Sequence, residues 1–147
     1  MQQPHERTAA AADLRRGAIR LARRLRAERP ADALSANKIG VLGYLFRHGS
    51  STPGAVAAAE HQRPQSLTRV FTELEHDGLL VRTRSDRDGR QSMLELTAAG
   101  RDALTRDMAD RDAWLAAALA ELTDTEAEVL RIAGALMDRL ADATPTR

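Results

Sequence analysis

Two clusters of polar side chains in the middle of the chain carry donor and acceptor groups of well-defined geometry. The first cluster follows Pro64 and consists of Gln65, Ser66, Thr68 and Arg69. The second consists of three arginines, Arg84, Arg87 and Arg90. A Gln amide matches the edge of adenine and an Arg guanidinium that of guanine, while hydroxyl groups bind bases or phosphates. These residue types favour contacts with nucleic acid, although each cluster alone also fits a solvated helix face or a charged turn.

The first cluster lies on a predicted helix. Pro64 is favoured at a first helical position, and Gly78 ends the helix. The apolar face consists of Leu67, Val70, Phe71 and Leu74. The polar cluster occupies the opposite face, in the first turns. Arg63 precedes the helix where Ser or Asp would be a better cap, so we expect Arg63 to face a phosphate instead.

Two helices are predicted before this one. The first begins at its N-cap, Ser35, and ends at Gly49. The second is short and runs from Pro53 to about Glu60, with Ser51 or Thr52 as its cap.

After Gly78 the hydrophobic pattern changes from a helical period to short β-like runs. These runs cover residues 79–82 and 92–96, and the polar segment 83–91 between them is typical of a hairpin tip. Three helices followed by a hairpin predict a winged helix-turn-helix over residues 35–96.

This arrangement suits double-stranded DNA. An α-helix fits the major groove, and its N-terminal residues reach the base edges. An arginine at a hairpin tip can enter the narrow minor groove of A·T-rich DNA. We assign that role to Arg90, with Arg84 and Arg87 as phosphate contacts. Asp88 can pair with Arg90 and fix the hairpin, and Arg87 can alternatively pair with Asp86.

The two ends of the chain predict long helices with narrow apolar stripes. The first runs from about Ala9 to Arg29, after a tail over residues 1–8, and Pro30 stops it. Thr97 caps a helix that extends to about Glu121, and the capping box of Thr123 and Glu126 begins another. We expect residues 143–147 to be a tail. Such thin stripes suit packing against a partner helix, so we assign the following leucines and valine to dimerisation: Leu14, Leu21, Leu25, Leu115, Leu119, Val129, Leu136 and Leu140.

The charge is unevenly distributed. Residues 1–30 contain eight arginines and three acidic residues, whereas residues 100–147 contain six arginines and ten acidic residues. The two ends can attract each other within one chain or between chains, or can simply be solvated. The overall net charge of +1 is lower than is usual for a nucleic-acid-binding protein, so any such binding must come from a local basic surface.

Several classes of function are excluded or disfavoured. The chain has no Cys, which removes disulfides, thiolate metal sites and a cysteine nucleophile. The four histidines are scattered, so we predict no metal site and no cofactor. Paired carboxylates, a Ser-His-Asp order and a Gly-rich phosphate loop are not evident, so we predict no enzymatic activity. Because no apolar run is long enough for a membrane span and the N-terminus is polar, we expect a cytoplasmic protein.

Several sequence segments together resemble one family. These are the segments 62–69 and 74–82, the wing sequence Asp88-Gly89-Arg90, and Leu96-Thr97-Ala98-Ala99-Gly100. Taken in order, they are similar to the MarR-family winged helix-turn-helix transcriptional regulators. The similarity runs nearly continuously over residues 53–100, and the helix layout extends it to almost the whole chain.

The resemblance implies a mainly α fold with a small β-hairpin and a homodimer built from the first, fifth and sixth helices. It also implies recognition of a pseudo-palindromic operator and release by small aromatic or phenolic ligands. Tyr44 and Trp114, together with Phe46, are candidates for lining such a ligand pocket, although aromatic residues often belong to the core. The thiol-oxidation branch of the family requires a reactive Cys, which this chain lacks.

We therefore predict a DNA-binding transcriptional regulator that acts as a repressor of nearby genes. Residues 1–34 are assigned to a tail and dimerisation helix, residues 35–96 to the DNA-binding domain, and residues 97–147 to further dimerisation helices. The alternative is a winged-helix module that binds proteins and not DNA, but such a module has no evident need for three arginines on its wing.

Overall fold

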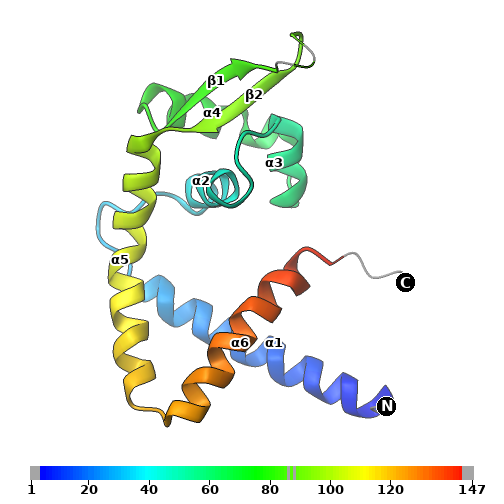
Figure 1. Ribbon diagram of the computed structural model, residues 1–147, viewed down its shortest axis with the longest axis vertical. Coiled ribbons are helices and arrows are strands. Elements are labelled where there is room, and N and C mark those ends of the chain that lie inside the picture. The colour runs from blue at the N-terminus through cyan, green and yellow to red at the C-terminus, as the bar shows by residue number, and fades with distance from the viewer. Residues whose placement is uncertain (1–3, 86, 88, 144–147) are drawn as a thin grey trace.

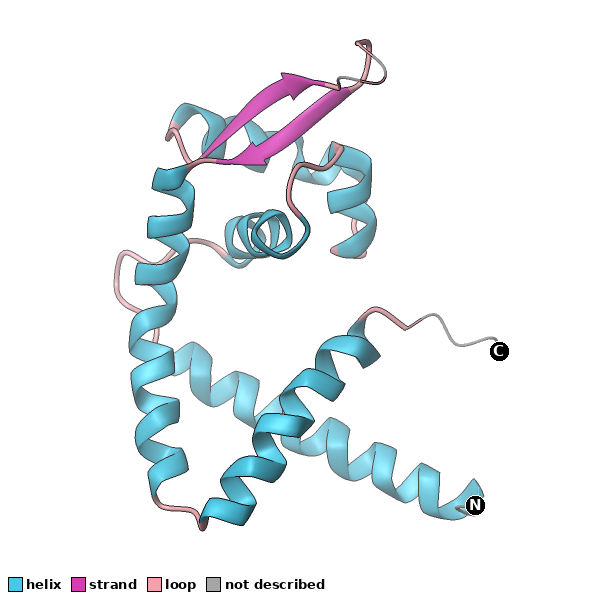
Figure 2. Ribbon diagram, viewed as in Figure 1, coloured by secondary structure: helices cyan, strands magenta, loops and turns pink. Residues whose placement is uncertain are grey.

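The computed structural model describes residues 4–85, 87 and 89–143. The chain is mainly α-helical with one antiparallel hairpin, as predicted (Figures 1 and 2). The elements in order are α1 (Pro4–Ala27), α2 (Ala36–His48), α3 (Pro53–Ala59), α4 (Pro64–His76), β1 (Leu80–Arg84), β2 (Ser92–Leu96), α5 (Ala98–Ala120) and α6 (Asp124–Ala141).

Local signals in the sequence explain most of these boundaries. Ser35, Thr52, Thr97 and Thr123 are N-caps whose side-chain oxygens accept backbone N–H groups, which confirms the predicted starts of α2, α3, α5 and α6. Gly49 and Gly78 follow α2 and α4 with φ of 74° and 72°, values that glycine adopts without strain.

The expected tail over residues 1–8 is wrong for residues 4–8, because α1 already begins at Pro4. Pro4 suits the first turn of a helix, and the alanines that follow have the highest helix propensity. At its other end α1 stops at Ala27, and the next residues form a turn before Pro30. Of the predicted C-terminal tail, only Ala143 is described, and it is not helical.

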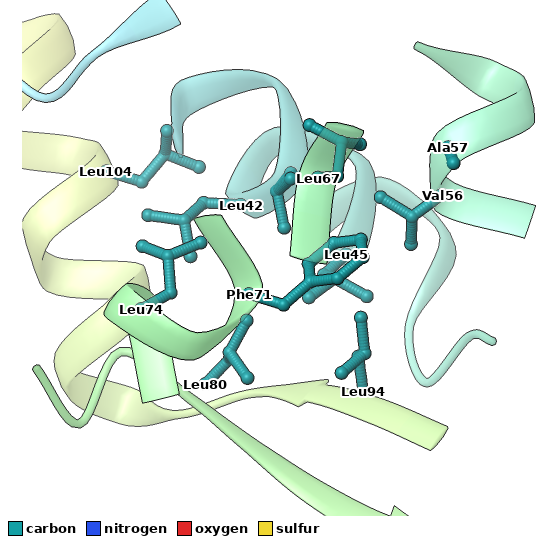
Figure 3. Packing of buried hydrophobic residues seen from close by; sticks show 11 residues of the cluster. Leu42, Leu45, Val56, Ala57, Leu67, Phe71, Leu74, Leu80, Leu94 and Leu104 are labelled. Carbon is teal, nitrogen blue, oxygen red and sulfur yellow. The ribbon is translucent and has the colours of Figure 1, made fainter. Parts of the chain in front are cut away.

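The hydrophobic core lies in the winged lobe, between α2, α3, α4 and the hairpin. Figure 3 shows aliphatic side chains from these elements converging on Phe71 of α4. The fully or almost fully buried members are Val41, Leu42, Leu45, Val56, Ala57, Leu67, Phe71, Leu74, Leu80 and Leu94. Burial of Leu67, Phe71 and Leu74 fixes the orientation of α4, so that its opposite face is turned to solvent.

The two strands of the hairpin pair with each other, and one backbone bridge attaches them to the lobe. Leu80 pairs with Leu96 at its base, and Arg84 pairs with Ser92 toward its tip. Ser51, in the loop between α2 and α3, exchanges two backbone hydrogen bonds with Leu94, at N···O distances of 3.1 and 2.8 Å. This bridge holds the hairpin against the helices while its tip extends beyond the lobe (Figure 2).

The base of the hairpin is joined to α5 by tight packing around Gly100. The Thr97 hydroxyl donates to the carbonyl of Gly78 at 2.7 Å and accepts from the N–H of Gly100 at 2.9 Å. A Cβ atom on Gly100 would lie only 1.9 Å from the carbonyl oxygen of Leu79. The Leu-Thr-x-x-Gly sequence therefore brings α5 as close to the hairpin as backbone atoms permit.

A buried carboxylate connects α5 to the loop before α2. Asp107 is 5% exposed, accepts the backbone N–H of Leu34 at 2.8 Å and is paired with Arg111. Arg29 donates to the carbonyl of Leu34. Arg111, one turn further along α5, is thus the partner that neutralises Asp107.

In Figure 1 the lower half of α5 extends below the winged lobe, α1 lies against that half, and α6 runs from the far end of α5 back toward the lobe. None of the 18 residues of α6 is buried. Exposed apolar side chains on the two helices include Leu14, Ile19, Leu21, Val129, Leu130, Ile132, Leu136, Met137 and Leu140. Within one chain these helices therefore leave a large apolar surface uncovered.

Candidate nucleic-acid interface

The exposed face of α4 carries the first predicted cluster. Gln65, Ser66, Thr68 and Arg69 are all exposed, opposite the buried Leu67. Arg63 occupies the N-cap position with extended backbone, is exposed, and makes no side-chain capping bond. The structure therefore brings these five side chains to one end and one face of a single helix.

The threonine hydroxyls on this face are oriented by the helix itself. Thr68 donates to the carbonyl of Pro64 at 3.2 Å, and Thr72 donates to the carbonyl of Thr68 at 3.0 Å. Their hydroxyl protons are engaged in these bonds, so their oxygens are presented outward as acceptors. Acceptors suit the amino groups that cytosine and adenine display in the major groove.

Ion pairs flank the exposed face of α4. Arg69 Nε donates to Glu73 Oε1 at 2.8 Å, and Lys38 Nζ, from α2, lies 3.2 Å from Glu73 Oε2. The hydrogen bond from Arg69, and next that from Lys38, hold the pKa of Glu73 below its ordinary value of 4.5. Arg82 Nε, from β1, donates to Glu75 Oε2 at 3.1 Å. The helix is thus linked to α2 and to the wing.

The hairpin carries a basic hollow of about 630 Å³. It is lined by Arg82, Thr83, Arg84, Gly89, Arg90 and Ser92. Two of the three predicted wing arginines, Arg84 and Arg90, lie here. Arg87 is exposed at the tip and its backbone N–H donates to Ser85 Oγ at 3.3 Å, but it does not line the hollow. Asp88 and Asp86 lie outside the described residues.

The sequence analysis did not assign Arg82 to this surface. A signal was available, because Arg82 and Arg84 are two residues apart on one strand and must project from the same face. With Arg82 included, three guanidinium groups line one hollow, a distribution suited to a polyanion.

The aromatic candidates for a ligand pocket are not brought together. Tyr44 is half-buried against the lobe core, with its ring 4.3 Å from that of His48. Trp114 is half-buried on α5, with the guanidinium of Arg24 4.5 Å from its ring centroid. A cleft of about 430 Å³ between α2 and α5 is lined by neither, but Phe46, Arg47, Leu104 and Met108 line it.

Comparison with known proteins identifies the family. The family model of the transcriptional regulators SarA/Rot matches residues 29–106. An HTH-type transcriptional regulator of Mycobacterium tuberculosis is 36% identical over 135 residues, which cover 92% of this chain and 94% of that relative. A solved transcriptional regulator from Pseudomonas aeruginosa is 34% identical with a TM-score of 0.78, covering 97% of this chain and 100% of the other.

A MarR family protein from Bacillus stearothermophilus shares the fold with a TM-score of 0.77 at 20% identity, over 97% of this chain and 100% of the other. The chain belongs to the SarA/Rot family of transcriptional regulators. It has the winged helix-turn-helix fold of the MarR family protein, and its relatives are HTH-type transcriptional regulators.

Two further observations concern membrane spans and metal sites. No helix in the described part of the chain is long and apolar enough to span a membrane. Among residues 4–85, 87 and 89–143, no three His, Asp or Glu side chains are grouped so that they could hold a metal ion.

Proposed function

We propose that this chain is a homodimeric repressor that binds a pseudo-palindromic operator with one winged lobe on each half-site. In each lobe α4 enters the major groove, where Gln65, Ser66, Thr68 and Arg69 contact bases, and Arg90 enters the adjacent minor groove. Arg63, Arg84, Arg87 and Arg82 contact phosphates. The expected pairing of Asp88 with Arg90 involves a residue that lies outside the described part of the chain.

The observation that carries this proposal is the exposure of four base-reading side chains on one face of a helix whose other face is buried. The arginine-lined hollow on the hairpin complements this face, because phosphate contacts fix the register and orientation of a protein on the duplex. Each guanidinium that reaches a phosphate also releases counterions, so the affinity should fall steeply with salt.

The dimer is supported by the apolar side chains that α1 and α6 leave exposed. Among the eight predicted dimerisation residues, Leu25, Leu115 and Leu119 are half-buried, whereas the others are between 40% and 58% exposed. An 18-residue helix with no buried residue gains little from folding on its own, since tertiary packing supplies most helical stability. We assign residues 1–34 and 97–147 to the dimer and residues 35–96 to DNA recognition.

Ligand-relieved repression is the second part of the proposal. The PcaV regulator of Streptomyces coelicolor, 24% identical with a TM-score of 0.55, was solved in complex with its natural ligand. The cleft between α2 and α5 offers apolar side chains, with Arg47, Thr105 and Asp112 as polar groups, and suits a small aromatic ligand. Tyr44 and Trp114 remain candidates for second contacts from neighbouring turns.

The DNA-binding proposal is tested by Arg90→Ala in the full-length chain. We expect a loss of about 1–3 kcal/mol in affinity for a duplex selected from a random-sequence pool, with folding and oligomeric state unchanged. Arg131→Ala, on the exposed surface of α6, is the matched control and should bind as the wild type does. If Arg90→Ala bound the duplex with wild-type affinity, the proposed minor-groove contact would be refuted. If the wild-type protein selected no duplex, the protein-binding alternative would be favoured.

The dimer is tested by sedimentation of Leu136→Asp. This side chain is 43% exposed, and a charge placed in the proposed interface should yield monomers. Val81→Asp is the control, since Val81 on β1 is equally exposed at 43% but lies far from α6. A dimer that persists in Leu136→Asp would refute the proposed interface.

A further inference from the structure

We propose that Glu73 is a positioning residue for base reading by Arg69, and that Lys38 holds Glu73 in place. This inference rests on the proposed function, because it assigns Arg69 to the DNA. The three residues form one connected chain of ionic hydrogen bonds from the body of the lobe to the exposed face of α4.

Arg69 is the outermost member of this chain. Its side chain is 90% exposed, yet its Nε atom is bonded to Glu73 Oε1 at 2.8 Å. An unrestrained arginine at such a site samples many rotamers, and ordering it on binding can cost as much as about thirtyfold in an equilibrium constant. A bond at Nε restrains the guanidinium before DNA arrives.

Glu73 is itself held from the other side. Lys38 Nζ lies 3.2 Å from Oε2 of Glu73, so the two carboxylate oxygens serve two different cations. Lys38 belongs to α2, its side chain is only 19% exposed, and its Nζ also lies 3.4 Å from Asp77 Oδ2. Glu73 and Asp77 thus hold the ammonium group of Lys38 at the end of α4. Because Lys38 is bonded to Glu73, the carboxylate of Glu73 does not move freely with the side chain of Arg69.

The geometry leaves the terminal nitrogens of Arg69 exposed for hydrogen bonds to a base. The bond to Glu73 is made by Nε, so the end of the guanidinium that is formed by the two terminal nitrogens is left to pair with O6 and N7 of guanine. A carboxylate near phosphates weakens binding to any DNA sequence. Its benefit must therefore appear as selectivity at one base pair and not as affinity.

The test measures that selectivity in the full-length chain. A duplex is selected from a random pool, and fluorescence anisotropy at one salt concentration compares it with each single base-pair variant and with a scrambled duplex. Arg69→Ala should lose roughly fivefold to 150-fold discrimination at one base pair. Glu73→Gln should lose about threefold to thirtyfold at that same pair, while its binding to the scrambled duplex stays equal or rises.

Two controls separate positioning from general effects. Glu128→Gln removes a similar exposed carboxylate that is bonded to Arg131 on α6, and it should leave discrimination unchanged. In the Arg69→Ala background, Glu73→Gln should have no further effect on discrimination, because the residue it positions is gone. Lys38→Gln should reduce discrimination at the same base pair, and all variants should melt as two-state folded proteins.

The outcomes are distinct. The positioning role alone would be overturned if Glu73→Gln discriminated between base pairs as the wild type does. It would also be overturned if Glu73→Gln changed discrimination equally at every base pair and did so in the Arg69→Ala background as well. A wild-type chain that binds selected and scrambled duplexes equally would refute the proposed DNA-reading function, and this inference with it.

Discussion

Replacing Gly100 by Ala tests the packing that joins the wing to α5. The new Cβ would lie 1.9 Å from the carbonyl oxygen of Leu79 and 2.7 Å from Leu96 Cδ1, both far inside van der Waals contact. The carbonyl cannot move freely, because the N–H of Thr97 donates to it at 3.2 Å. The substitution must therefore push α5 away from the base of the hairpin.

The expected cost follows from three contributions. Overpacking of this kind costs about 1–3 kcal/mol, and loss of the hydrogen bond from Thr97 to Leu79 costs about 1 kcal/mol. Replacing a helical Gly by Ala stabilises the helix by about 1 kcal/mol, which offsets part of this cost. We expect a net destabilisation of about 2 kcal/mol, which lowers the melting temperature by roughly 4–8 °C in a domain of this size.

Gly54→Ala is the matched control for this experiment. Gly54 lies in α3, outside the proposed dimer helices, and the nearest atom to a Cβ there is Thr52 Oγ1 at 4.0 Å, so the substitution should not destabilise the protein. Both variants are measured by thermal and urea denaturation at one protein concentration. A Gly100→Ala protein as stable as the wild type would refute the close approach of α5 to the hairpin.

Three other measurements test separate parts of the structure. Asp107→Ala should lower the free energy of unfolding by about 3 kcal/mol, because Arg111 loses its buried partner, and unchanged urea denaturation would contradict the buried pair. The Thr123 side chain and backbone lower the pKa of Glu126, so its stabilising contribution should be complete above the ordinary value of 4.5 and be lost as pH falls through the lowered pKa. Stability curves of wild type and Glu126→Gln should therefore converge in acid, and a constant difference would argue against the capping box. For Arg84→Ala, the slope of log affinity against log salt concentration should be shallower by about 1, and an unchanged slope would exclude its phosphate contact.

Much of the fold could be predicted from the sequence because it depends on interactions between near neighbours. The caps at Ser35 and Thr97 act within three residues of their own position, and Gly49 and Gly78 adopt backbone angles that other residues avoid. The change from a helical period to short β-like runs after Gly78 predicted the hairpin for the same reason. The exposed face of α4 followed from the periodicity of its apolar residues.

Only the tertiary structure decided how distant segments meet. Asp107 pairs with Arg111 one helical turn away, but the fold is what buries this carboxylate against the backbone of Leu34. Lys38 of α2 reaches Glu73 of α4 because the two helices pack together. Sequence periodicity determines which face of a helix is apolar, but the partner of a charged side chain depends on the positions of whole elements, which are set by the packing of the core.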